Sequence, residues 1–379
     1  MRISDIKIEE ENGKQTLSAL CGDFHLWYAF PEPLTPILKA DAFIAACLVP
    51  AMAKGSDIII EDDVPVSSAL LSNLEQLQTI FSFWSKYFHQ DLKKINIIGG
   101  KKIDSKGGWN KTISFFSGGV DGTYTYLKHA QEIDYLLFAK GIDMQLSNDD
   151  LYNEALNKNK QYLDSNGHEL VPFETNVRFL GHHYGLNWGN CFGGGLSSIA
   201  LALGAKKCFI AAGLTYENLL PESSNFITDH LWSNGFTEFV HDGAESLRIN
   251  KLKEIANNSS ALSILRVCWH DNGYNCGQCE KCLRTMASIR ALKLNVPTFP
   301  PLTDELIKQR LSKFKIHNIL DIDFIDENIA QATLVNDKVL LKALKSIKRS
   351  FELRQLLRDI DKLLLFNFID KLKRYRSKN

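Results

Sequence analysis

A short glycine-containing stretch, Ser117-Gly118-Gly119, offers the first chemistry in this chain. The preceding residues 112–116 alternate β-branched and aromatic side chains as a buried strand does, and a helix can follow from residue 120. At such a strand-to-helix turn, two glycines let backbone N–H groups converge, the helix dipole adds positive potential, and a serine hydroxyl donates a further hydrogen bond. The stretch therefore predicts a phosphate-binding turn, with an ordinary glycine-rich turn as the alternative.

A carboxylate follows this turn, because Asp121 falls in the first turn of the expected helix, where it can hold a metal ion or cap the loop. Residues 117–121, S-G-G-V-D, resemble the S-G-G-x-D-S signature of the PP-loop ATP pyrophosphatases. The resemblance implies that the turn binds the pyrophosphate end of ATP together with Mg²⁺, and that an acceptor carboxylate is adenylated with release of pyrophosphate. The residues that carry over to the nucleotide-binding positions are Ser117, Gly118, Gly119 and Asp121.

One position departs from that signature. Its last serine is replaced by Gly122, and a hydroxyl returns only at Thr123. Either Thr123 supplies the hydroxyl to the nucleotide, or one phosphate contact is missing, and both residues are counted with the expected ATP site. A catalytically decayed, zinc-stabilised binding protein is accordingly the main alternative to an enzyme.

Strand and helix patterns alternate after the turn. Residues 135–139 and 169–173 are short apolar runs typical of strands, and 149–165 has helical spacing between them. This β-α-β-α-β pattern predicts an α/β fold with a parallel sheet, in which ligands bind at the carboxyl ends of the strands. Asp143 and Arg178 follow two of these strands and are expected at the ATP site; a helix cap and a surface ion pair are their alternative roles.

Two later segments carry further candidate residues. The long polar connection 213–233 follows a predicted strand, and we expect it to recognise the substrate through Ser223, Ser224 and Asp229. The helix expected at 246–256 places two cations three residues apart on one face, where they can neutralise a leaving pyrophosphate or be ordinary solvated charges. These cations are Arg248 and Lys251.

Four of the eight cysteines are crowded between residues 268 and 282. Their spacing, C-x7-C-x2-C-x2-C, places four thiolates where Zn²⁺ needs a tetrahedral shell, and four protein ligands leave no position for water. We therefore predict a structural rather than a catalytic zinc site, with an iron–sulfur cluster as the remaining alternative. The expected ligands are Cys268, Cys276, Cys279 and Cys282.

The cysteine segment also resembles the C-terminal zinc segment of the 7-cyano-7-deazaguanine synthase family, the queuosine-pathway members of the PP-loop superfamily. Both motifs occur in the expected order, so the resemblance covers roughly residues 109–292. It implies an adenine nucleotide alpha-hydrolase-like, Rossmann-like domain and a C–N ligase that activates a deazaguanine-like carboxylate for amide or nitrile formation. The additional residues at both ends argue for a different acceptor, a small molecule or a macromolecule. Sulfur transfer to tRNA, as in thiolating PP-loop enzymes, would require a free reactive cysteine.

The length of 379 residues suggests two or three domains. We expect an N-terminal α+β module of unassigned role at 1–108, the ATP-binding domain at 109–298 and a C-terminal helical region at 299–379. The boundary signals are a glycine-rich segment at 99–110, interpreted as a linker, and a proline-rich segment at 297–301.

Composition limits the classes of partner. Lys plus Arg and Asp plus Glu number 44 each, so no overall charge favours a polyanionic partner. Residues 331–379 contain 13 basic and 5 acidic residues. No aromatic platform on which bases could stack accompanies them, so nucleic acid binding is not indicated. No apolar run approaches ~18 residues and the start turns acidic, so we expect a cytoplasmic protein without membrane contact. The sequence leaves room for a homodimer.

Overall fold

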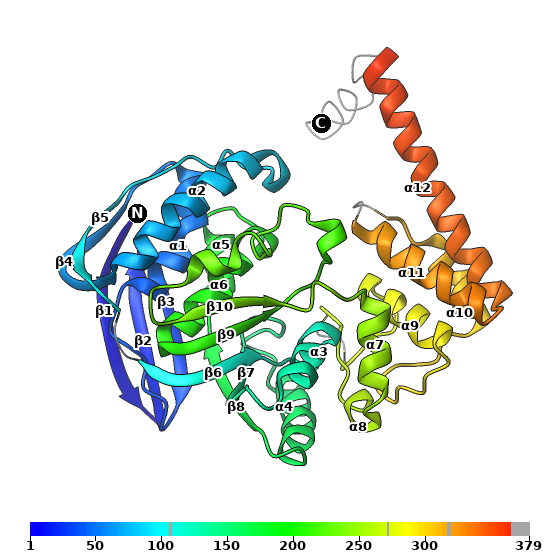
Figure 1. Cartoon of the computed structure of the whole chain (residues 1–379), viewed down its shortest axis with the longest axis horizontal. Coiled ribbons are helices and arrows are strands. Elements are labelled where there is room, and N and C mark those ends of the chain that lie inside the picture. The colour runs from blue at the N-terminus through cyan, green and yellow to red at the C-terminus, as the bar shows by residue number, and fades with distance from the viewer. Residues whose placement is uncertain (106–107, 271–272, 317–319, 365–379) are drawn as a thin grey trace. The chain divides into compact units, whose positions relative to one another are not determined.

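A ten-stranded sheet is the central feature of the computed structural model, which describes residues 1–105, 108–270, 273–316 and 320–364. Its strands lie in the order β10-β9-β6-β7-β8-β3-β2-β1-β4-β5 (Figure 1). The strands are β1 (Arg2–Glu11), β2 (Lys14–Cys21), β3 (Phe24–Pro31), β4 (Ile58–Ser67), β5 (Ile97–Ile103), β6 (Trp109–Phe115), β7 (Tyr135–Lys140), β8 (Glu169–Thr175), β9 (Ala205–Ala211) and β10 (Glu238–Asp242).

The sheet is mixed but largely parallel. Strands β10, β9, β6, β7 and β8 pair in parallel, because long connections with helices join consecutive strands. Strands β1, β2 and β3 form an antiparallel meander joined by tight turns, and β3 pairs antiparallel with β8. The predicted α/β fold is thus confirmed, and the sheet extends further than the sequence indicated.

Helices cover both faces of the parallel half (Figure 1). Helices α3 (Val120–His129) and α4 (Asp149–Asp164) follow β6 and β7 on one face. Helices α5 (Val177–His183) and α6 (Trp188–Leu203) follow β8 on the other, and the chain then returns to the far side of β6 as β9. This reversal makes the carboxyl ends of β6 and β9 the topological switch point, where open parallel sheets form a crevice for ligands.

Glycines let α6 pack closely against α1 (Asp41–Lys54). A side chain at Gly194 would collide with the carbonyl oxygen of Ala45 and lie 3.1 Å from the ring of Trp232. Helix α1 is buried along nearly all its length, so its sequence is apolar all round rather than striped. Helix α6 therefore packs closely, with α1 as its main helical neighbour.

The elements expected around the turn are confirmed. The strands expected at 112–116, 135–139 and 169–173 are β6, β7 and β8. The helix expected from residue 120 is α3, and the helix expected at 149–165 is α4. These elements place the turn 117–119 between β6 and α3.

The linker expected at 99–110 is wrong, because much of that segment belongs to strands β5 and β6. Gly99 and Gly100 have φ angles of 83° and 72°, and a side chain at Gly99 would collide with the carbonyl oxygen of Ile60. The register between β4 and β5 shifts between Ile60 and Pro65. The glycine pair therefore serves a close and irregular strand pairing, not a domain boundary.

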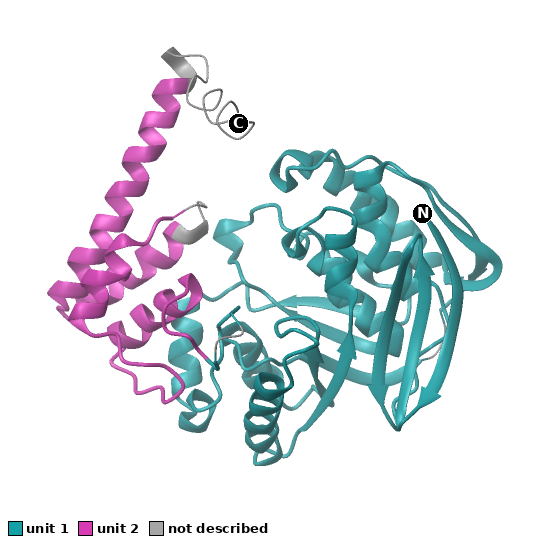
Figure 2. Cartoon of the chain, turned by 180° about the vertical axis from the view of Figure 1, so that it is seen from behind, with its two compact units in different colours: residues 1–274 teal, residues 275–379 magenta. Residues whose placement is uncertain are grey.

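Contacts divide the chain into two compact units, residues 1–274 and 275–379 (Figure 2). Strands β1 to β5 belong to the same sheet as β6 to β10, so residues 1–108 have no sheet of their own. The three domains predicted from the sequence place their boundaries elsewhere, near 108 and 298.

The second unit is helical. Its α-helices are α9 (Glu280–Ala291), α10 (Asp304–Gln309), α11 (Leu320–Leu334) and α12 (Lys338–Leu364). Among the helices of the described ranges, none combines the length and the apolar character that crossing a bilayer requires.

Candidate functional site

Asp121 is held between two cations at the start of α3. Arg248 donates from Nη1 to Oδ2 of Asp121, and Nζ of Lys251 lies 3.2 Å from Oδ1. Both cations come from the beginning of α7 (Arg248–Ala256), which packs against α3. Lys251 also donates to the carbonyl oxygen of Ala212, just beyond β9, at 2.7 Å. The structure thus brings the three predicted residues together at the switch point of the sheet.

Burial and charge fix the state of this cluster. The side chain of Lys251 is only 2% exposed and that of Asp121 is 23% exposed. Burial by itself would raise the pKa of the Asp121 carboxyl, but the charges and hydrogen bonds of Arg248 and Lys251 hold that pKa well below its usual range. Asp121 is therefore ionised at physiological pH, and its two cations are fixed beside the turn.

The turn 117–119 requires glycine at its centre. Gly118 has a φ angle of 76°, and its carbonyl oxygen accepts a hydrogen bond of 2.9 Å from the backbone N–H of Arg266. A Cβ at this position would lie 2.6 Å from the carbonyl oxygen of Ile264 and 2.9 Å from Oδ1 of Asn159. Ser117 is half-buried and precedes the N-terminus of α3, where backbone N–H groups lack partners within the helix.

The two positions that follow Asp121 pack against the sheet. A Cβ at Gly122 would lie 3.1 Å from the carbonyl oxygen of Phe115, a tight contact that favours glycine where α3 approaches β6. Thr123 is fully buried, and its hydroxyl has no hydrogen-bond partner in the described part of the chain. Replacement of the motif serine by Thr123 stays a prediction.

Asp143 and Arg178 lie at the same edge of the sheet, beyond β7 and β8. Arg178 donates from Nη1 to the carbonyl oxygen of Ile142, and Asp143 is half-buried in the adjoining turn. Among the described residues, neither side chain has a hydrogen bond or ion pair with the turn 117–119. Their predicted contact with a nucleotide therefore rests on their position at the edge alone.

The residues expected to recognise the substrate are buried inside their loop. Ser223 makes hydrogen bonds of 3.0 and 3.1 Å with the backbone of α6. Ser224 donates to Oδ2 of Asp229 at 2.8 Å, and the same oxygen lies 2.7 Å from Nδ1 of His241. These contacts fasten the connection between β9 and β10 to the domain. Substrate binding by the three residues stays a prediction, and this geometry assigns them to holding the loop.

Four sulfur atoms converge in the segment 268–282. The sulfur atoms of Cys268, Cys276, Cys279 and Cys282 all lie within 4.8 Å of one another, and those of Cys276 and Cys282 are 3.9 Å apart. A tetrahedral Zn²⁺ with bonds of about 2.3 Å needs sulfur–sulfur distances of about 3.8 Å, so the cluster fits the ion. The N–H groups of Cys279 and Cys282 point at the sulfurs of Cys276 and Cys279 at 3.3 and 3.4 Å, which favours thiolates. The predicted four-cysteine cluster is confirmed as a geometry suited to a metal.

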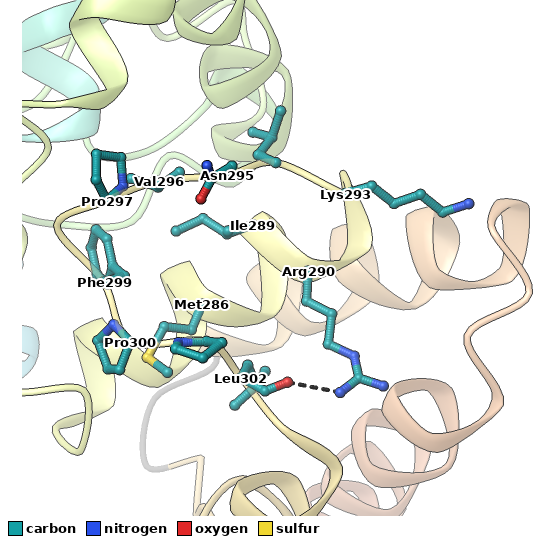
Figure 3. A pocket seen from close by; sticks show the side chains of 12 residues that line it. Met286, Ile289, Arg290, Lys293, Asn295, Val296, Pro297, Phe299, Pro300 and Leu302 are labelled. Carbon is teal, nitrogen blue, oxygen red and sulfur yellow. Dashed lines mark hydrogen bonds between the residues drawn. The ribbon is translucent and has the colours of Figure 1, made fainter.

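A cavity of about 500 Å³ lies in the second unit, beside α9 and the proline-rich segment that follows it (Figure 3). Met286 and Phe299 are among the apolar residues that line it. Arg290 donates to the carbonyl oxygen of Leu302 at 2.7 Å and pairs with Asp337 at 2.6 Å. Arg290 therefore holds the segment in place, and the cavity includes none of the residues predicted to do chemistry.

Two buried polar residues beside the turn were not predicted. Asn159 is fully buried, and neither its Oδ1 nor its Nδ2 has a hydrogen-bond partner in the described ranges. Arg266 is 4% exposed, and its Nε and Nη2 are likewise without partners there. Helical periodicity could have predicted burial of Asn159, because it lies on the same face of α4 as the buried residues Ala155 and Tyr162. Arg266 lies in an irregular segment where no periodicity indicates burial.

Comparison of the chain with models of known protein families, with curated proteins and with solved structures found no match. The resemblance to a known family is therefore limited to the two motifs, residues 117–121 and 268–282. The geometry of the site is the basis for a functional proposal.

Proposed function

We propose that this protein is an ATP-dependent adenylating enzyme of the PP-loop type, which activates a carboxylate with release of pyrophosphate. The observation that carries the proposal is the cluster of Asp121, Arg248 and Lys251 beside the turn 117–119. The sequence predicted that these three residues act on the same nucleotide. They lie together at the topological switch point, where nucleotides bind in comparable sheets.

The turn suits the phosphates of ATP. Gly118 and Gly119 carry no side chain that would cover the backbone, the N-terminus of α3 favours an anion, and Arg248 and Lys251 add two positive charges. The side-chain amide of Asn159, beneath the turn, has no hydrogen-bond partner in the described part of the chain, which further indicates unused hydrogen-bonding capacity. Mg²⁺ usually takes one or two carboxylates and completes its shell with phosphate oxygens and water, so Asp121 is the carboxylate available to it.

The chemistry requires no nucleophile from the protein. Adenylation depends on placing the acceptor carboxylate in line with the α-phosphate and on neutralising the charge of the departing pyrophosphate. Arg248 and Lys251 would supply that neutralisation. The acceptor would be a deazaguanine-like carboxylate or another small or macromolecular carboxylate, and an amine would then displace AMP. Zn²⁺ at the four cysteines would hold the fold, because no ligand position remains open.

Sulfur transfer is disfavoured by the state of the cysteines outside the cluster. Cys191 is 5% exposed and Cys208 is fully buried. Burial raises the pKa of Cys191 to about 12 and that of Cys208 well above its usual value. Such thiols are not nucleophilic thiolates at neutral pH.

A binding protein without catalysis remains the second candidate, on one observation. The hydroxyl of the motif serine is absent at Gly122, where a Cβ would make a tight contact of 3.1 Å with the carbonyl oxygen of Phe115. Such a protein would bind Mg-ATP, visible as a thermal shift, without catalysing exchange.

The test is exchange of labelled pyrophosphate into ATP, run with a panel of candidate carboxylates. We expect carboxylate-dependent exchange that Asp121→Asn abolishes. Asp150→Asn is the matched control, because Asp150 is an exposed carboxylate in the first turn of α4. Absence of both exchange and Mg-ATP binding in the unmodified protein would contradict the proposal. Binding without exchange for any carboxylate would favour the second candidate.

A further inference from the structure

Arg266, whose backbone adjoins the turn, is a buried cation that has no counter-ion among the residues the structure describes. Its guanidinium makes no ion pair with any carboxylate among the described residues, and its Nε and Nη2 are without hydrogen-bond partners there. Its backbone, by contrast, is fixed to the turn by the 2.9 Å hydrogen bond to Gly118. An unpaired buried charge is costly, so proteins keep one mainly where a ligand completes it.

Asn159 presents a second unsatisfied group at the same place. It belongs to α4, and its Oδ1 lies 2.9 Å from where a Cβ of Gly118 would be. Its neighbour Lys158 holds Nζ 5.3 Å from the ring centroid of Tyr274. The Tyr274 hydroxyl in turn donates to the carbonyl oxygen of Ile264 at 2.7 Å. Helix α4, residues 264–266 and Tyr274 therefore converge beneath Gly118.

The two unsatisfied groups differ in position from the cations of α7. Arg248 and Lys251 contact Asp121, inside α3, whereas the backbone of Arg266 and the side chain of Asn159 adjoin Gly118, before the helix begins. Hydrogen-bonding groups thus stand at both ends of a short stretch of backbone. A single phosphate group can accept hydrogen bonds from only one of these two sets of groups, whereas a chain of phosphates can accept hydrogen bonds from both.

Resting on the proposed function, we propose that Arg266 and Asn159 form a second arm of this site, which makes it selective for polyphosphates over a single phosphate. Arg266 donates from Nε and Nη2 to oxygens of one phosphoryl group, and Asn159 donates from Nδ2. Arg248 and Lys251 face the neighbouring phosphoryl group. Because Arg266 and Asn159 are buried, the turn shifts to admit the ligand, and Gly118 and Gly119 permit that movement.

The experiment is calorimetric titration of the full chain with pyrophosphate and, separately, with orthophosphate, both with Mg²⁺. The variants are Arg266→Gln and Asn159→Leu, and Lys253→Gln is the control, because Lys253 is an exposed cation of α7. We expect Arg266→Gln to weaken pyrophosphate binding by about 10- to 100-fold, as loss of charged hydrogen bonds does. Orthophosphate binding and the control should change little.

A stability measurement separates this role from a structural one. Arg266→Gln removes an unpaired buried charge and Asn159→Leu removes an unsatisfied buried amide, so the melting temperature of the ligand-free protein should stay level or rise. A fall of several degrees with unchanged pyrophosphate affinity would show that the residues serve the fold and would overturn the inference.

Three other outcomes are distinguishable. If unmodified protein binds pyrophosphate and both variants match it within about twofold, the inference fails while the proposed function stands. If the variants lose orthophosphate and pyrophosphate equally, selectivity is not due to this arm. If unmodified protein binds neither pyrophosphate nor ATP, the proposed function itself fails.

Discussion

Lys251 Nζ lies 3.2 Å from Oδ1 of Asp121 although 130 residues separate the two in the chain. The ammonium is nearly inaccessible and also donates to the carbonyl oxygen of Ala212. Through these two contacts Lys251 joins the first turn of α3, the end of β9 and the beginning of α7. Asp121 therefore has a structural duty, as the counter-ion of a buried lysine, besides any role with a ligand.

Asp121→Asn should destabilise the protein, because it leaves Lys251 buried without a counter-charge. We expect the free energy of unfolding to fall by about 2–4 kcal/mol, somewhat below the usual cost of breaking a fully buried pair because Asp121 is partly exposed. Urea denaturation at pH 7 measures the change. Asp150→Asn should change stability by less than about 0.5 kcal/mol. Equal stability of the two variants would mean that Lys251 needs no counter-ion.

Acid should weaken the protein through two carboxylates of the parallel half. Burial would raise the pKa of Asp242, but hydrogen bonds from Lys128 at 2.8 Å, His129 at 2.9 Å and Thr125 at 2.8 Å lower it. The pKa of Asp121 is lowered as well. A lowered folded-state pKa gives stability that is complete well above the unfolded value of about 3.9 and is lost as the pH falls through the folded value.

We therefore expect the free energy of unfolding to decline from about pH 5 downward, with a shallower decline in Asp242→Asn. Urea denaturation at several pH values between 7 and 3 gives both slopes. Asp150→Asn should follow the unmodified protein. An unchanged slope in Asp242→Asn would show that Asp242 keeps an ordinary pKa in the folded state.

The sequence predicted the elements near the turn because their signals are local. Residues 112–116 and the helix from residue 120 carry strand and helix periodicity within a few residues of the glycines. The spacing of Arg248 and Lys251 likewise required only the geometry of one helix. What could not be predicted is that this face meets Asp121, since that depends on how α7 packs on α3.

Other features depend wholly on tertiary structure. Gly99 and Gly100 resemble a linker in sequence, and only the neighbouring strand β4 shows why glycine is needed. Ser223 and Asp229 look like loop residues free to bind a substrate, yet both are buried by their contacts with α6 and His241. Polarity in a sequence indicates hydrogen bonding, and it does not indicate whether the partner is a ligand or the protein itself.

Metal should be required for the fold around the four cysteines. We expect about one equivalent of zinc per chain by mass spectrometry, and removal by a strong chelator should lower the melting temperature. Cys279→Ser should lose the metal and destabilise the protein by on the order of 3 kcal/mol. Cys191→Ala, which removes a buried cysteine outside the cluster, should keep the full metal content. Iron in place of zinc would support the iron–sulfur alternative, and absence of both metals would contradict the site.

Two glycines with the same backbone angle allow the crowding beneath the turn to be measured. Gly118 and Gly167 have φ angles of 76° and 77°, so alanine costs about 1–2 kcal/mol in backbone strain at either position. A Cβ at Gly167 meets no atom within 4 Å, whereas one at Gly118 meets the carbonyl oxygen of Ile264 and the amide of Asn159. Gly118→Ala should therefore lose more free energy of unfolding than Gly167→Ala, by about 1–3 kcal/mol, as overpacking does. Urea denaturation of both variants measures the steric cost, because the backbone strain is the same in both and cancels in the difference between their free energies of unfolding. Pyrophosphate binding should be lost only in Gly118→Ala; equal stability and equal binding in the two variants would show that the turn has room to spare.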